Sequence, residues 1–185
     1  MVRNFKAATA TIPIVGDMAD PIAWGIVDSL ARPGGNITGV SNTEGEKIMG
    51  KRLGLLRELI PGAARVGYLA SRDVADSTHG VDMREAVHQA GLSLVGPLLE
   101  TISEAEYRRV FELMTRERAD AFIVRAQGDH VTYDRLIIEL AEKSRLPALF
   151  PYPSFAELGG LIAYGNDAID LYRRAAGYRL PRRPS

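Results

Sequence analysis

Short apolar runs alternate with amphipathic segments along most of the chain, and this alternation constrains the fold more than any other feature of the sequence. After residue 64 the apolar runs predict strands over residues 65–70, 92–99, 121–126, 148–152 and 161–164. The segments between them predict helices over residues 78–90, 103–118, 133–144 and 153–158, and a last helix that begins at Asp167. Five strands in regular alternation with helices are typical of a doubly wound parallel sheet. We therefore predict an α/β fold of the Rossmann-like, three-layer αβα type, with helices on both faces of the sheet.

The first 60 residues contain fewer elements of the same kind. Asp20-Pro21 is typical of a helix start, with Asp20 as the N-cap and proline in the first turn. Pro33-Gly34-Gly35-Asn36 cannot continue a helix, because it combines a missing N–H, two flexible glycines and a turn-forming side chain. A domain boundary is predicted near Pro61-Gly62. Before that boundary the apolar residues predict strands over 11–15 and 37–41, a helix over about 20–30, and a second helix over about 48–60.

A series of short motifs, spaced in order along the chain, carries a family resemblance. The main motifs are SLARPGGNITGVS at 29–41, GKRL at 50–53, RERADA at 116–121, LPA at 146–148, GGL at 159–161 and YG at 164–165. With these motifs the sequence resembles the substrate-binding component of ABC transporters, in the bacterial family whose known members bind aromatic amino acids. Such proteins are similar to type I periplasmic binding proteins, in which two α/β lobes clamp a ligand between them.

The resemblance implies a function, a partner and a location. It implies a solute-binding component, or a fragment of one, that takes a small amino-acid-like ligand, as the family's aromatic amino acids illustrate, and that works with an ABC transporter permease. It also implies a periplasmic location. The sequence itself predicts no signal peptide, because no long apolar region follows the basic residues of Met1 to Lys6, and the chain is expected in the cytoplasm if expressed as written.

By the same resemblance the chain is predicted to be truncated at both ends. Residues 1–61 correspond to a remnant of the first lobe with a connecting helix, residues 62–176 to a complete α/β lobe, and residues 177–185 to a tail outside the family. Because half of the cleft walls would be missing, we expect weak or no binding of aromatic or branched amino acids by this chain alone. The unpaired strand edges and the apolar residues around Trp24 predict a homodimer through residues 10–45.

Ligands of doubly wound sheets bind beyond the carboxyl ends of the strands. The loops predicted there offer hydroxyls, amides, a carboxylate, a guanidinium and a phenol, which are the groups needed to hold a zwitterion and an aromatic ring. Polar residues in such loops also occur simply as exposed turns and caps, so each residue alone has this second interpretation. Two features depart from the family, since Arg72-Asp73 stands where an Asn-Pro pair is common and Arg125 charges a usually apolar strand end. The candidate ligand-binding residues are Asp17, Ser41, Asn42, Ser71, Arg72, Gln127, Tyr152 and Asn166.

Composition and motif spacing exclude several classes of function. The chain has no cysteine and carries 23 basic and 23 acidic residues, which argues against thiol chemistry and against nucleic acid as a partner. The histidines at 79, 88 and 130 have no metal-ligand spacing and no nucleophilic serine motif, so we predict surface or cap roles for them, and no catalytic residue, metal or cofactor. Two alternatives stay open: a flavodoxin-like or nucleotide-using enzyme, although residues 71–74 lack phosphate-loop glycines, and a ligand-free, self-associating fragment.

Overall fold

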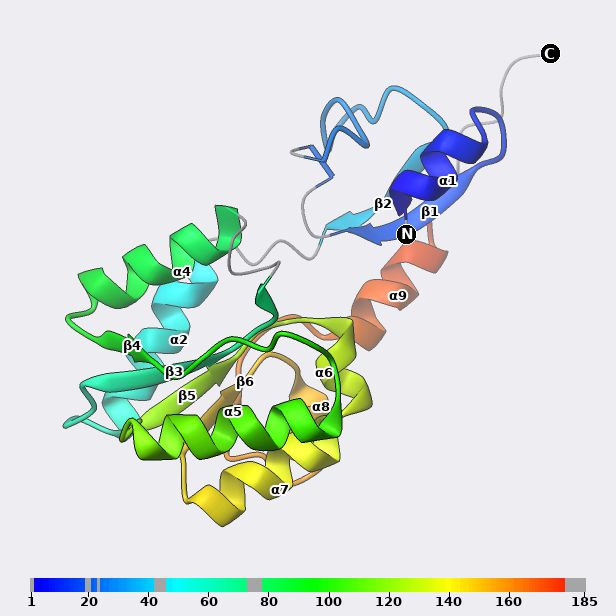
Figure 1. Cartoon of the computed structure of the whole chain (residues 1–185). Coiled ribbons are helices and arrows are strands. Elements are labelled where there is room, and N and C mark those ends of the chain that lie inside the picture. The colour runs from blue at the N-terminus through cyan, green and yellow to red at the C-terminus, as the bar shows by residue number, and fades with distance from the viewer. Residues whose placement is uncertain (1, 19–20, 23, 42–45, 73–77, 179–185) are drawn as a thin grey trace. The chain divides into compact units, whose positions relative to one another are not determined.

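The computed structural model describes residues 2–18, 21–22, 24–41, 46–72 and 78–178, and the chain divides into two compact units. Unit 1 consists of Met1–Thr43 and Asn166–Ser185, and unit 2 consists of Glu44–Gly165 (Figure 1). The candidate residue Asn42, the loop residue Asp73 and the predicted N-cap Asp20 lie outside the described residues.

Unit 2 is built on a five-stranded parallel sheet with the order β4-β3-β5-β6-β7. Every neighbouring pair in this order is parallel, as a sheet made from strand–helix–strand units requires. The predicted parallel α/β architecture is therefore confirmed, and each predicted run contains one strand, although the strands are shorter. The strands are β3 (Arg65–Leu69), β4 (Ser93–Val95), β5 (Ala121–Val124), β6 (Ala148–Phe150) and β7 (Ile162–Ala163).

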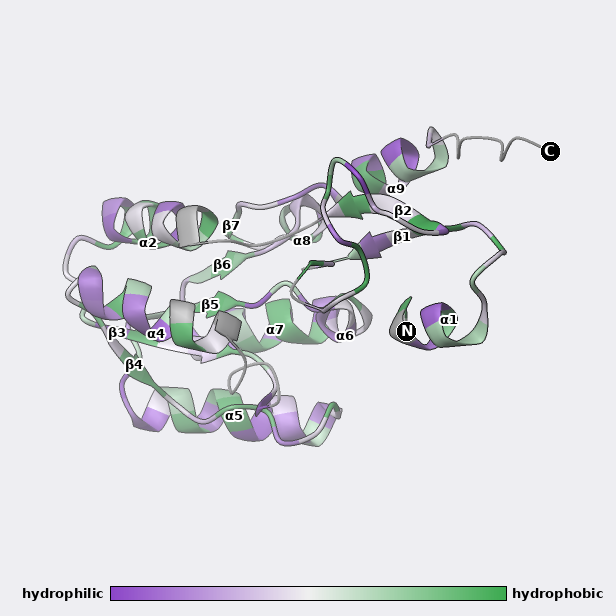
Figure 2. Ribbon diagram, turned by 90° about the horizontal axis from the view of Figure 1, so that it is seen from above, coloured by the Kyte–Doolittle hydropathy of each residue, from purple (hydrophilic) through white to green (hydrophobic). Residues whose placement is uncertain are grey.

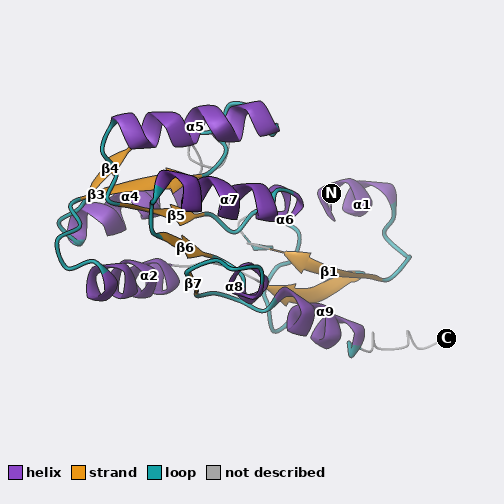
Figure 3. Cartoon of the chain, turned by 90° about the horizontal axis from the view of Figure 1, so that it is seen from below, coloured by secondary structure: helices purple, strands orange, loops and turns teal. Residues whose placement is uncertain are grey.

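Side chains alternate across this sheet and build a separate core on each face. On β5, Phe122 and Val124 pack into the cluster formed with α5 (Glu104–Arg116), α7 (Asp134–Ser144) and α8 (Pro153–Glu157). Ala121 and Ile123 pack into the other cluster, with α2 (Glu46–Leu59) and α4 (Thr78–Gln89). Figure 1 shows the strands between α2 and α4 on one side and α5 and α7 on the other, and Figure 3 shows α7 lying across the strands. In Figure 2 the central strands are mostly hydrophobic, whereas the helices are striped, as expected for a sheet covered on both faces.

Helix α2 belongs to unit 2, and this places the division of the chain earlier than the boundary expected near Pro61. Three apolar residues of α2, Met49, Leu53 and Leu56, are at most 5% exposed and join the cluster on the α2–α4 face. The apolar stripe predicted for residues 48–60 therefore covers the second sheet. At the other end, α9 (Ala168–Ala176) belongs to unit 1, where it packs against both strands of that unit.

Unit 1 contains a two-stranded parallel sheet of β1 (Ile14–Met18) and β2 (Ile37–Ser41), with α1 (Val2–Ala8) preceding it. The prediction of a strand over residues 11–15 is wrong by three residues. The Thr9 hydroxyl accepts from the N–H groups of Thr11 and Ile12 and holds this segment in a turn. The strands also approach closely in the middle: a Cβ atom at Gly39 would lie 1.8 Å from the carbonyl oxygen of Gly16, which only glycine permits.

The helix predicted over residues 20–30 is absent from the described part of this segment, which forms turns instead. Gly25 has a φ of +63°, a left-handed conformation that an α-helix does not accommodate. The turns nevertheless bury part of the predicted apolar face, since Ile26 and Val27 pack with Met18 and Ile37 in a small core. None of the described helices has the length and apolar character needed to cross a membrane.

Candidate ligand-binding site

The candidate site in unit 2 lies where the strand order changes direction. The chain leaves β3 towards β4 on one side, and β5, β6 and β7 follow on the other side, so the carboxyl ends of β3 and β5 flank the switch point. Ser71 follows β3 and Gln127 follows β5. The Ser71 N–H donates to the Gln127 side-chain oxygen at 3.1 Å, and the Gln127 amide nitrogen donates to the Ser71 hydroxyl at 2.8 Å. This reciprocal pair joins two of the predicted site residues across the switch point.

An open pocket of about 580 Å³ lies beside this pair. Its volume falls in the range of small-molecule sites. Leu99 supports its floor, because the Leu99 N–H donates to the Ala70 carbonyl and its own carbonyl accepts from the Arg72 N–H, each at 3.0 Å. The lining combines six polar or charged residues, from three separate segments of the chain, with two apolar ones. The lining residues are Ser71, Arg72, Leu99, Glu100, Thr101, Ile102, Gln127 and Asp129.

Arg72 lies in this pocket as one member of an ion pair. Its Nε is 2.8 and 2.7 Å from the two carboxylate oxygens of Glu100, and its Nη2 also contacts Glu100. The hydrogen bond from Arg72 holds the pKa of Glu100 below its usual value. Both side chains are about half exposed, so the pair contributes little to stability but orients the two groups along one wall of the pocket.

Glu106 anchors the same wall from helix α5. Its Oε1 accepts from the Glu100 N–H at 2.9 Å, and its carboxylate also accepts from Arg109 at 2.6 and 2.7 Å. The hydrogen bonds from Arg109, followed by that from the Glu100 backbone, lower the pKa of Glu106 to about 2. Ser103 caps the helix, since its hydroxyl accepts from the Glu106 N–H. The Glu106 carboxylate, however, holds the pocket wall through the Glu100 backbone.

His130 lies behind the pocket and is fully buried, so the predicted surface or cap role is wrong for this residue. Its Nε2 is 3.2 Å from the Leu69 carbonyl oxygen, and its Nδ1 is 2.7 Å from the Tyr107 hydroxyl. A carbonyl oxygen only accepts, so Nε2 carries the proton and Nδ1 accepts from Tyr107. Burial is the main reason that the pKa of His130 falls to about 4, and burial also raises the pKa of Tyr107. Both ring nitrogens are thus committed to the fold. His88 is exposed, as predicted.

Two arginines are buried on the α2–α4 face of the sheet. Arg52 of α2 is fully buried and donates from Nε to the Tyr164 carbonyl oxygen at 2.8 Å. Arg125 follows β5 directly and is 7% exposed, and its Nη1 is 3.5 Å from the Tyr68 hydroxyl. The Nε of Arg125 is buried and has no hydrogen-bond partner within the described residues. Arg125 is visible in the sequence as a charged strand end, but it is not among the predicted ligand-binding residues, because its burial cannot be read from the sequence.

The other predicted site residues lie elsewhere. Asp17 is within β1 and Ser41 ends β2, both in unit 1, so the loop expected at Gly16-Asp17 is part of a strand. The hollow beside Ser41 measures only about 20 Å³, which is too small for an amino acid. Tyr152 is the N-cap residue of α8 and stacks near Phe155, whereas Asn166 belongs to unit 1. The structure therefore brings Ser71, Arg72 and Gln127 into one pocket.

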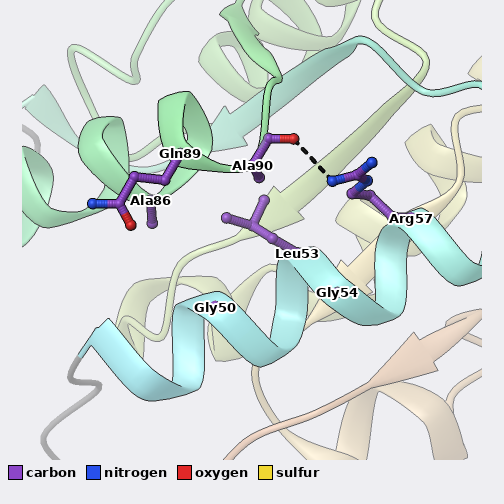
Figure 4. A pocket seen from close by; sticks show the side chains of 7 residues that line it. All are labelled: Gly50, Leu53, Gly54, Arg57, Ala86, Gln89 and Ala90. Atoms are coloured by element: carbon purple, nitrogen blue, oxygen red, sulfur yellow. Dashed lines mark hydrogen bonds between the residues drawn. The ribbon is translucent and has the colours of Figure 1, made fainter.

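A second hollow, of about 460 Å³, lies between α2 and α4 (Figure 4). Two glycines of α2 and two alanines at and after the end of α4 line it, and its polar side chains are Arg57 and Gln89. Arg57 donates to the Ala90 carbonyl oxygen at 3.2 Å. This hollow lies away from the carboxyl ends of the strands, and it offers few polar groups to a ligand. Among the described residues, no group of three histidine or acidic side chains could hold a metal ion.

A parallel α/β unit with a polar pocket at its switch point has the architecture in which small-molecule sites commonly occur. The chain belongs to the family described as ABC transporter substrate binding protein, whose model matches residues 2–179. The resemblance and the fold class predicted from the sequence are therefore confirmed.

Individual relatives agree with this assignment. The chain is 25% identical over 162 residues to the tyrosine-binding protein of Clostridioides difficile, covering 86% of this chain and 45% of that protein. It is similar to the solved ABC domain in complex with L-Trp from Streptococcus pneumonia, with a TM-score of 0.76 and 25% identity, covering 92% of this chain and 56% of the other. A conserved domain protein from Vibrio cholerae shares the fold, with a TM-score of 0.79 and 20% identity over 95% and 58% of the two chains. The chain thus spans about half the length of these relatives.

Proposed function

We propose that this chain acts as a solute-binding component of an ABC transporter and takes a small amino acid, of the aromatic type, at the switch point of unit 2. The observation that carries the proposal is the polar pocket beside Ser71 and Gln127. A pocket of this volume accommodates an amino acid, and its hydroxyl, amide and carboxylate groups are suited to an ammonium group and a polar backbone. The relatives described as binding tyrosine and as holding L-Trp support an aromatic ligand.

Binding without chemical conversion fits this pocket better than catalysis. His130, the nearest candidate for a general base, is neutral, buried and hydrogen-bonded through both nitrogens. Arg72 and Glu100 are paired with each other, so neither is poised for proton transfer. A substrate-binding protein of this family would work outside the cytoplasm, where its ligand-bound form would deliver the ligand to a membrane permease. Tyr152 in unit 2 and Asp17, Ser41 and Asn166 in unit 1 stay candidates for further ligand contacts.

An NMR titration of the isotope-labelled chain tests the proposed function. On addition of L-Trp or L-Tyr up to millimolar concentration, we expect chemical-shift changes at the amides of Ser71, Thr101 and Gln127. Gln127→Ala should weaken the response by about tenfold, because it removes the amide that spans the switch point and leaves the Ser71 N–H without its acceptor. Gln89→Ala, in the hollow between α2 and α4, is the matched control and should leave the response unchanged. Shifts confined to the α2–α4 surface, or no response to any amino acid, would contradict the proposal.

We also propose that unit 1 mediates a homodimer through residues 10–45. This segment carries large apolar side chains that are at least 41% exposed, and monomers seldom leave large apolar patches exposed. Parallel strands are normally covered on both faces, and open strand edges invite pairing with a second chain. A two-fold axis would bury the same surface of both copies. The exposed apolar residues of this segment are Ile12, Val15, Ile22, Trp24 and Leu30.

Trp24→Glu is expected to convert the dimer into a monomer, because it replaces an exposed apolar side chain of the proposed interface by a charged one. Size-exclusion chromatography with light scattering at tens of micromolar chain measures the mass directly. Tyr172→Glu, which puts the same charge on the exposed face of α9 outside residues 10–45, is the control and should leave the dimer intact. A wild-type monomer at this concentration, or a dimer unaffected by Trp24→Glu, would refute the interface.

A further inference from the structure

Arg125 occupies the position in unit 2 where a buried positive charge is least expected. It directly follows β5, the central strand of the sheet, and its N–H continues the pairing with β3 by donating to the Leu69 carbonyl oxygen at 3.0 Å. The two carboxyl ends that flank the switch point are therefore held together at this residue. Its side chain lies by the hydroxyl of Tyr68, a residue of the cluster that faces α2 and α4.

The charge of Arg125 is not compensated within the described residues. The guanidinium group stays protonated in proteins, and burying it without a counter-ion or full hydrogen bonding is unfavourable. Its Nε is buried without a partner, and its one hydrogen bond, to Tyr68, is long at 3.5 Å. The ion pairs formed between described residues use Arg72, Arg108, Arg109, Lys143 and Arg174.

Arg52, the other buried arginine on this face of the sheet, differs from Arg125 in its hydrogen bonding. It is buried more completely and one of its nitrogens, Nη1, also makes no hydrogen bond among the described residues, but its Nε donates to the Tyr164 carbonyl oxygen at 2.8 Å. Arg52 therefore has a structural task in holding the chain after β7. A similar task is missing for the Arg125 side chain in the described part of unit 2, although its planar, five-donor group is suited to binding a carboxylate through two parallel hydrogen bonds.

We propose that Arg125 binds the carboxylate of the ligand at the β3–β5 switch point, where it lies beside the Tyr68 hydroxyl on the α2–α4 face of the sheet, outside the lining of the pocket at Ser71 and Gln127. The inference rests on the proposed function for the identity of the ligand as an amino acid. It adds the group that recognises the charged end and the chemical class that is required, namely a carboxylic acid. A phosphate ligand fits less well, because the loop after β3 begins Ser71-Arg72 and lacks the glycines that let backbone N–H groups surround a phosphate.

Three ligands that share the indole ring separate the contributions of the ligand's carboxylate and ammonium groups to binding. L-Trp carries both a carboxylate and an ammonium group, indole-3-propionate carries only the carboxylate, and tryptamine carries only the ammonium group. For the wild-type chain we expect the resonance of Arg125 Nε–H to move downfield with L-Trp and with indole-3-propionate, and to stay in place with tryptamine. This measurement needs no variant and reads the proposed contact at its own atom.

Variants then test whether the contact provides affinity. Arg125→Met removes the charge and keeps a side chain of similar volume. We expect it to weaken the binding of L-Trp and of indole-3-propionate by at least about tenfold and to leave the binding of tryptamine unchanged. Arg125→Lys keeps the charge but loses the two-point contact, and it should give an intermediate loss. Arg135→Met, an exposed arginine on α7, is the matched control and should bind as the wild type does. Circular dichroism and amide spectra establish that each variant is folded.

The outcomes distinguish this inference from the proposed function. If the wild type binds L-Trp and Arg125→Met binds it equally well, Arg125 is not the carboxylate anchor, although amino-acid binding stands. If L-Trp does not bind but indole-3-propionate binds through Arg125, the carboxylate site stands and the amino-acid function is wrong. If the Arg125 Nε–H resonance responds to neither carboxylate at millimolar concentration, the inference is overturned whether or not the variants fold.

Discussion

Phe122→Ala is expected to lower the free energy of unfolding by about 4 kcal/mol, because it opens a cavity in the centre of the larger core. Phe122 lies on the central strand β5 and is fully buried. Its ring packs edge-on against Phe111 at a centroid distance of 5.0 Å and against Phe150 at 6.3 Å. These neighbours come from α5 and β6, so removing the ring weakens both the helix–sheet and the strand–strand packing.

Urea denaturation followed by circular dichroism measures this loss. Leu161→Ala is a suitable control, because Leu161 is in the same unit and is 63% exposed, and its truncation should change the stability by no more than about 0.5 kcal/mol. A loss below about 1 kcal/mol for Phe122→Ala would show that the core around β5 is packed differently.

The stability of the chain is expected to fall by about 3 kcal/mol as the pH is lowered from 6.5 to 4, because of His130. The pKa of His130 is about 4 in the folded chain and is 6.5 in its ordinary state, so the unfolded chain binds the extra proton first. The folded state is therefore favoured above pH 6.5 and loses this advantage as the pH falls towards 4. Below pH 4 both states carry the proton and His130 adds no further dependence.

The carboxylates with lowered pKa values affect the stability in a different pH range. Glu100, Glu106 and Glu139 have an ordinary pKa of 4.5, and Asp120 one of 3.8, so their contributions are lost only as the pH falls below those values. The slope of the free energy of unfolding against pH between 6.5 and 4.5 is therefore expected to report His130. His130→Asn should be less stable at pH 7, and its stability should not change with pH in this range; His88→Asn, which removes an exposed histidine, is the matched control. An unchanged slope in His130→Asn would disprove the assignment.

The family and the order of the elements in unit 2 could be predicted from the sequence because both depend on local information. Each strand of the five-stranded sheet is a short apolar run, and Tyr107, Phe111 and Met114 have the helical spacing that places all three in the core. Ser103 and Glu106 have the spacing of a capping box, and Ser103 does cap α5. These features depend on neighbours within a few residues along the chain.

Unit 1 shows where local patterns mislead. Residues 21–31 have an apolar pattern that suits a helix, but Gly25 takes a left-handed conformation and the segment folds as turns over β1 and β2. Strand β1 starts at Ile14 because a turn at Thr9 precedes it and because Gly16 pairs with Gly39. The turn at Thr9 is local, whereas the pairing of Gly16 with Gly39 and the packing of residues 26–27 with Met18 and Ile37 join separate segments, which no short window of sequence contains.

For the candidate site, too, some features could be predicted from the sequence and others depend on the tertiary structure. By itself the sequence determined that polar residues follow β3 and β5, and the parallel topology then placed Ser71, Arg72 and Gln127 at one edge of the sheet. Only the tertiary structure decided that Ser71 and Gln127 bond to each other, that Glu100 pairs with Arg72, and that His130 and Arg125 are buried. The physical reason is that residue type sets what a side chain can donate, accept or bury, whereas its partner and its exposure are set by segments that fold against it from elsewhere in the chain.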